Sequence, residues 1–252
     1  MPDSWEVATG LMEKSEIINA LGRKYACGRY LEVCAPTTGH QFADIDRTVF
    51  KTCDRLIYNC PDSYDDGLAI TYRTPFPGSY DVIRANIPNP GSYDLVFVDP
   101  YHSYDATMID LLGAFRILSE SGILVVHDCN PSDSELVGRE YRPKAWCGLT
   151  YAAFVDFCLS TIGSAYFTVD CDFGVGVVFR KAAAAPSEFR MTKLSDKNRL
   201  DWFVAKSNDH QRFAYFRTHR KRLLHLITPE RFGEFAGMAQ SPANAERDIA
   251  AR

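Results

Sequence analysis

The sequence contains no long apolar segment. Its apolar runs, such as those at residues 122–126 and 175–179, have the length of a strand and fall far short of the roughly 20 residues that span a bilayer. We therefore expect no membrane partner. Residues 1–6 also lack the basic and apolar regions of a secretory signal, so we expect a cytoplasmic protein.

Paired cysteines and an excess of positive charge are also missing. The eight cysteines are scattered and form no C-x-x-C pair, which favours buried reduced thiols over a disulfide framework. The formal net charge is −4, so the chain as a whole has no electrostatic surface for nucleic acid. A basic cluster at residues 217–222 is interpreted as a solvated helix face.

What the sequence does contain is an alternation of apolar, β-branched runs with longer helical patterns between residues 11 and 180. This alternation predicts a doubly wound α/β fold with a mostly parallel, seven-stranded sheet, closed by an antiparallel pair at one edge. We expect helices at 11–24, 104–121 and 151–159, and strands at 30–34, 55–58, 68–72, 93–98, 123–126, 166–169 and 175–180.

The composition changes at residues 182–187, which are mostly alanine. Residues 194–235 then show two or three amphipathic helices rich in aromatic and basic side chains. We therefore divide the chain into a Rossmann-like domain, 1–181, and a helical C-terminal extension, 182–252, with a loose end. The aromatic side chains of the extension are expected to be buried from solvent, so we expect the extension to pack on the domain or to form a homodimer contact.

Polar side chains follow three of the expected strands. They are Glu32 with the loop at 34–40, then Asp99 and His102, then His127 and Asp128. In open α/β sheets, ligands bind beyond the carboxyl ends of the strands, where the strand order reverses. We therefore expect these side chains to converge on one site.

These residue types suit two kinds of chemistry. Asp99 and Asp128, with His127 as a third donor, would form a site for Mg²⁺ or another divalent metal. His102 beside a carboxylate is a candidate base for a substrate hydroxyl, and Asp99 and His127 are the other catalytic candidates. A purely structural interpretation is that His127 and Asp128 bond to the loop that they begin.

Three segments resemble a known family. Residues 94–104 and 122–131 are similar to the fourth and fifth strand motifs of class I S-adenosylmethionine-dependent methyltransferases. Residues 169–177 resemble one branch of that superfamily, small bacterial enzymes that modify sugars or other small hydroxylated molecules. The resemblance implies S-adenosylmethionine as cofactor and methyl transfer to a hydroxyl, with metal assistance as an option.

The resemblance also implies roles for individual residues. Glu32 would anchor the amino group of the cofactor, Asp99 and Asp128 match positions that hold Mg²⁺ in metal-dependent relatives, and His102 matches a candidate base. The cofactor-binding candidates are Glu32, Cys34, Ala35, Thr38, Gly39, Asn59 and Asp99.

Three segments differ from the pattern of the family. Cys34-Ala35-Pro36 replaces glycines of the cofactor loop, and Pro100 follows Asp99 where the family has glycine. The second strand lacks the acidic residue that would hold the ribose, which leaves Asn59 or Asp62 as a substitute. Two alternatives to methyl transfer therefore stay open. One is a cofactor-altered binding or scaffold protein, and the other is a metal-dependent hydrolase that uses Asp99, His127 and Asp128.

Overall fold

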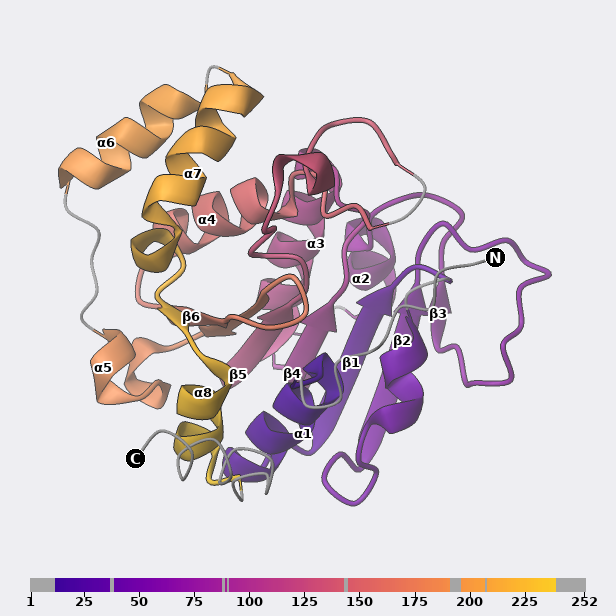
Figure 1. Ribbon diagram of the computed structural model, residues 1–252. Helices are drawn as coiled ribbons and strands as arrows, with labels where there is room; N and C mark the ends of the chain where they lie inside the picture. The colour runs from indigo at the N-terminus through magenta and orange to yellow at the C-terminus, as the bar shows by residue number, and fades with distance from the viewer. Residues whose placement is uncertain are drawn as a thin grey trace, which may run out of the picture.

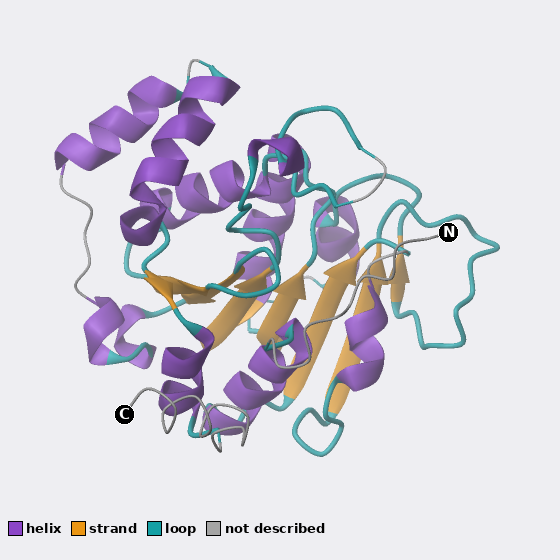
Figure 2. Cartoon of the chain, in the orientation of Figure 1, coloured by secondary structure: helices purple, strands orange, loops and turns teal. Residues whose placement is uncertain are grey.

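A single mixed sheet organises the computed structural model, which describes residues 12–36, 39–87, 89, 91–142, 145–190, 196–206 and 208–238. The strand order is β3-β2-β1-β4-β5-β7-β6-β8. The strands are β1 (Arg29–Cys34), β2 (Thr52–Ile57), β3 (Tyr72–Arg73), β4 (Tyr93–Val98), β5 (Leu118–Val126), β6 (Ala165–Val169), β7 (Val175–Phe179) and β8 (Leu226–Ile227). Figure 2 shows the sheet between layers of helices.

The strand directions confirm the doubly wound α/β prediction. Strands β3, β2, β1, β4 and β5 pair in parallel, and β7 lies antiparallel between β5 and β6. The chain passes from β1 to β2 on one side and returns to β4 on the other, so the order reverses between β1 and β4. Ligands of such sheets bind at this reversal.

The expected number of strands was wrong. Within the described residues the sheet has eight strands rather than seven, because β8 from the C-terminal extension pairs in parallel with β6. This short pairing covers the edge of β6 that would otherwise present unpaired backbone groups.

The third strand also lies later than expected, at Tyr72–Arg73 rather than 68–72. Buried Arg55 binds the Asp66 carboxylate and donates to the Leu68 carbonyl at 3.2 Å, and Leu68 N–H donates to Asp66 at 3.1 Å. These polar contacts hold Leu68 outside the sheet, so the strand begins only at Tyr72.

The helices cover both faces of the sheet. They are α1 (Lys14–Lys24), α2 (Tyr80–Asn86), α3 (Tyr104–Ile117), α4 (Thr150–Ser160), α5 (Ser187–Arg190), α6 (Asp196–Ala205), α7 (Asp209–Leu223) and α8 (Pro229–Ala236), with 3₁₀ turns η1 (Gly39–Asp44), η2 (Ser134–Leu136) and η3 (Ala182–Ala184). Helices α1 and α8 lie on one face of the sheet, and α2, α3, α4 and α7 lie on the other (Figure 1). The apolar side chains of each group form one core with the face of the sheet that they cover. Helix α3 ends four residues earlier than expected because β5 begins at Leu118, which pairs with Tyr93.

The C-terminal extension packs on both of these cores. Trp202 of α6 and Phe216 of α7 are fully buried on the side of α4, where Phe216 contacts Tyr151 at 4.6 Å between ring centroids. Phe232 of α8 is buried on the other side, against Phe167 of β6.

Among the described helices, none combines the length and the apolar character needed to cross a membrane.

Candidate active site

A cleft of about 950 Å³ opens at the carboxyl ends of the central strands. Its walls come from the start of α1, the segments that follow β1, β2, β4 and β5, and the loop between η2 and α4. This volume lies within the range of small-molecule and cofactor sites. The cleft therefore occupies the position that the topology predicts for a ligand.

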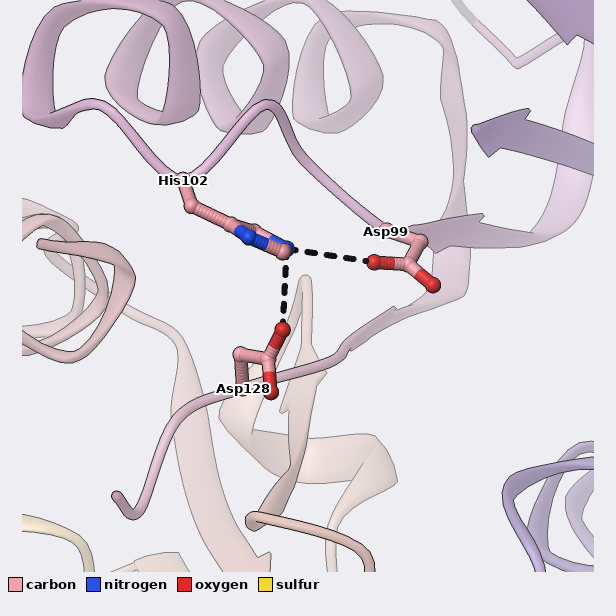
Figure 3. Close-up of side chains that lie close together, drawn as sticks. All are labelled: Asp99, His102 and Asp128. Atoms are coloured by element: carbon pink, nitrogen blue, oxygen red, sulfur yellow. Dashed lines mark ion pairs between the residues drawn. The ribbon is translucent and has the colours of Figure 1, made fainter. Parts of the chain in front are cut away.

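The polar centre of the cleft is a pair of carboxylate oxygens flanked by two imidazoles. His102 Nε2 lies 2.9 Å from Asp128 Oδ2 and 3.5 Å from Asp99 Oδ1 (Figure 3). His127 Nδ1 lies 3.4 Å and 3.5 Å from the same two oxygens. The structure therefore brings together Asp99, His102, His127 and Asp128, all four of which the sequence identifies as site candidates.

The backbone holds these side chains in place. Asp99 N–H donates to the Val33 carbonyl at 2.8 Å, and the Asp99 carbonyl accepts from the Tyr58 hydroxyl at 2.8 Å. His102 and Asp128 have left-handed φ values of 64° and 59°. Such strain in non-glycine residues clusters at functional sites because the surrounding structure has to enforce it.

Beyond this centre lies a further charged pair that the sequence analysis missed. His127 Nε2 is 3.2 Å from Asp172 Oδ2, and Lys14 Nζ is 3.2 Å from the same oxygen. Asp172 belongs to the turn between β6 and β7, and Lys14 begins α1. The acidic turn at 170–174 was a visible signal for Asp172, whereas nothing in the local sequence indicated Lys14.

The charges shift the pKa values of both histidines, of Asp99 and of Asp172. Burial lowers the pKa of both histidines, but contact with Asp128 and Asp99 outweighs it and raises the pKa of His102 to about 9 and that of His127 to about 10. Burial raises the pKa of Asp99, yet the two histidines hold it well below its ordinary value. His127 and Lys14 similarly outweigh burial at Asp172 and lower its pKa to about 2.

The residues of the centre fit a divalent metal. Within the described part of the chain, buried Asp99 Oδ1, His102 Nε2 and His127 Nδ1 have no correctly oriented hydrogen bond, although all three lie close to charged neighbours. Asp99, His102 and Asp128 each present a ligand atom within 4.8 Å of the others. Buried polar atoms without partners are costly, and a cation bound between them would satisfy them.

The cofactor-binding candidates fall into different positions. Ala35 and Asn59 line the cleft together with Asp99, and Asn59 has a left-handed φ of 51°. Gly39 begins η1, and Thr38 lies outside the described residues. Cys34 is fully buried and packs with Ile57 and Cys60, away from the described lining of the cleft.

Glu32 also lies outside the described lining of the cleft. It is fully buried, and its carboxylate accepts from the Tyr30 hydroxyl at 2.9 Å and from Gln41 Nε2 at 3.0 Å. Burial raises its pKa to about 8. Gln41 does line the cleft, and its hydrogen bond to Glu32 fixes the position of its side-chain amide there.

Comparison with known proteins agrees with the geometry. Residues 35–129 match a family model described as a methyltransferase domain, a segment that runs from the end of β1 past Asp128. This part of the chain is therefore similar to a methyltransferase domain. No curated protein gives a significant match.

Several solved structures align with the chain at low identity. A protein from Corynebacterium glutamicum shares 17% identity, covering 68% of this chain and 84% of that one, with a TM-score of 0.43. The cofactor-bound protein Rv0187 from MTB shares 12%, covering 70% and 84%, with a TM-score of 0.48. The O-methyltransferase TomG from Streptomyces achromogenes, involved in tomaymycin synthesis and solved with SAM, shares 11%, covering 66% and 78%, with a TM-score of 0.44.

Proposed function

We propose that this protein transfers a methyl group from S-adenosylmethionine to a hydroxyl of a small molecule or sugar, with the assistance of a divalent metal. The observation that carries the proposal is the polar centre, where His102 lies against Asp99 and Asp128 inside the cleft of a methyltransferase domain.

The part of the cleft beyond β1 and β2 suits the cofactor. Ala35 has a small side chain at the end of β1, which leaves room for a ligand close to the backbone. Gln41 and Asn59 provide amide groups for hydrogen bonds with amino and hydroxyl groups. Among the described lining residues, Lys14 is the only lysine or arginine, so it is the cation available to a carboxylate of the cofactor.

His102 is the candidate base for the acceptor. We infer that the acceptor hydroxyl gives its proton to His102 while its oxygen bonds to the methyl carbon and the carbon–sulfur bond breaks. His102 must be neutral to accept this proton, and its pKa of about 9 with no metal bound would keep it protonated at neutral pH. Asp99, Asp128 and His127 would hold a divalent cation, whose positive charge would lower this pKa and would stabilise the oxygen that develops.

An aromatic wall closes the acceptor end of the cleft. The Trp146 ring contacts those of His102, Tyr101 and Tyr141, with centroids 5.4, 6.3 and 5.5 Å apart. Its indole N–H donates to the Gly138 carbonyl at 3.3 Å, which fixes the ring in place. Such a wall offers an apolar face to a planar acceptor or a sugar ring.

Transfer of labelled methyl groups tests the proposal. The protein would be incubated with radiolabelled S-adenosylmethionine and a panel of sugars, polyols and phenols, with and without a chelator. We expect a labelled product, and we expect His102→Gln to lower its rate by about 10²- to 10⁴-fold with cofactor affinity unchanged. His210→Gln, on α7 outside the described lining of the cleft, is the control and should retain the full rate.

Other results of this assay would point elsewhere. Cofactor binding without transfer to any acceptor would favour the binding or scaffold alternative. Metal-dependent hydrolysis without cofactor would favour the hydrolase. The cytoplasmic location and the homodimer through the C-terminal helices stay predictions, the latter tested by sedimentation.

A further inference from the structure

The second ring nitrogen of His127 faces a carboxylate outside the polar centre. His127 follows β5, and its backbone N–H donates to the Val98 carbonyl at 3.0 Å. Its Nδ1 faces the oxygens of Asp99 and Asp128, and its Nε2 faces Asp172 at 3.2 Å. A histidine that binds metal through one nitrogen almost always has a carboxylate or carbonyl at the other. His127 has this arrangement.

The turn that carries Asp172 is fixed to the loop after β5. Cys129 N–H donates to the Gly174 carbonyl at 2.9 Å, and Asn130 N–H donates to the Phe173 carbonyl at 2.7 Å. A Cβ on Gly174 would lie 2.4 Å from Asn130 N, so the two segments are in direct backbone contact. Asp172 is therefore held at a set distance from the ring of His127.

Lys14 shares this side of His127 with Asp172. Its Nζ lies 3.4 Å from His127 Nε2 and 3.2 Å from Asp172 Oδ2, so both groups face the ring nitrogen that points away from the centre. Nδ1 is the nitrogen that faces Asp99 and Asp128. The arrangement therefore prepares an imidazole nitrogen as a metal ligand.

We propose that this centre selects a first-row transition metal ion over Mg²⁺, through the imidazole of His127, with Asp172 as the residue that positions it. The inference rests on the proposed metal-assisted function and goes beyond it in naming the class of metal. Mg²⁺ prefers oxygen ligands in a near-ideal octahedron, whereas imidazole suits the later divalent transition metals. His102 places a second imidazole beside the same two oxygens.

Metal titration of the metal-free protein tests this selectivity without any activity measurement. Co²⁺ binding would be followed by visible absorption and Mg²⁺ binding by competition against Co²⁺. We expect Co²⁺ to bind at least about 100-fold more tightly than Mg²⁺, since nitrogen donors strengthen the later transition metals. His127→Asp replaces the imidazole by a carboxylate, so it should reduce that ratio at least about tenfold and change the Co²⁺ spectrum.

The Asp172→Asn variant isolates the positioning role. It should weaken Co²⁺ binding by about 10- to 100-fold. Asp170→Asn is the matched control, because Asp170 lies in the same turn but binds Asn130, at 2.7 Å. The control should retain wild-type Co²⁺ affinity.

Two outcomes would overturn the inference, and they differ in their meaning for the function. Equal affinities for Co²⁺ and Mg²⁺, with an unchanged ratio in His127→Asp, would remove the selectivity and leave the methyltransferase proposal intact. The absence of any metal binding would remove the metal altogether. Measurements of S-adenosylhomocysteine binding and methyl transfer on the same sample would then show whether the cofactor-dependent function survives.

Discussion

Asp156 of α4 joins the C-terminal helices to the rest of the protein. Its carboxylate lies 2.5 Å from Arg212 Nη2 and 2.7 Å from Lys206 Nζ. It also accepts from the Trp202 indole at 2.7 Å and from the Tyr104 hydroxyl at 2.7 Å. The side chains of Asp156 and Arg212 are each only 6% exposed, so this ion pair is shielded from water.

We expect Asp156→Asn to lower the free energy of unfolding by about 3–5 kcal/mol, the usual cost of leaving one charge of a buried pair without its partner. The amide retains the shape of the carboxylate but not the charge that compensates Arg212. Tyr104 begins α3 two residues after His102, so the variant should also slow methyl transfer.

Urea unfolding followed by circular dichroism measures this effect. Arg139→Ala is the control, because Arg139 pairs with Asp209 at the surface and is 75% exposed. An exposed pair contributes at most about 1 kcal/mol. A loss below about 1 kcal/mol in Asp156→Asn would refute the claim that the buried carboxylate holds the helices in place.

Three further predictions concern the site. Gly148→Ala should slow methyl transfer at least about tenfold, because φ is +56° and the new Cβ would lie 2.1 Å from the His102 carbonyl oxygen. The control is Gly163→Ala, where φ is +83° and no heavy atom lies within 4 Å of the new Cβ. It should leave the rate of methyl transfer unchanged. Without metal, the raised pKa values of His102 and His127 stabilise the fold fully below their ordinary value of 6.5, and urea titrations should show this stability lost as pH rises through about 9 and 10. Metal binding should release protons from these imidazoles, seen in calorimetry as a heat that depends on the buffer, and metal affinity should rise with pH.

The sequence predicted the convergence of the polar residues because that convergence follows from topology. Asp99 and Asp128 end neighbouring parallel strands, so recognising the strands was enough to bring them together. His102 and His127 are close to these aspartates in the sequence, so the same two strands also place them at the site.

Contacts between distant segments lay beyond the sequence. Lys14 and Asp172 are far apart in the chain and meet at His127 only because α1 and the turn after β6 reach the same rim. Strand β8 is two residues long, Leu226–Ile227, too short for a periodic pattern to reveal. The hydrogen bond from Gln41 to Glu32 likewise joins η1 to β1, and no local pattern in the sequence indicates it.

Calorimetric titration with S-adenosylmethionine and S-adenosylhomocysteine tests the central claim most directly. The wild-type protein should bind both ligands with micromolar affinity. Ala35→Trp, which fills the cofactor end of the cleft, should lose that affinity while keeping its circular dichroism spectrum. A folded wild-type protein that binds neither ligand at millimolar concentration would contradict the methyltransferase account.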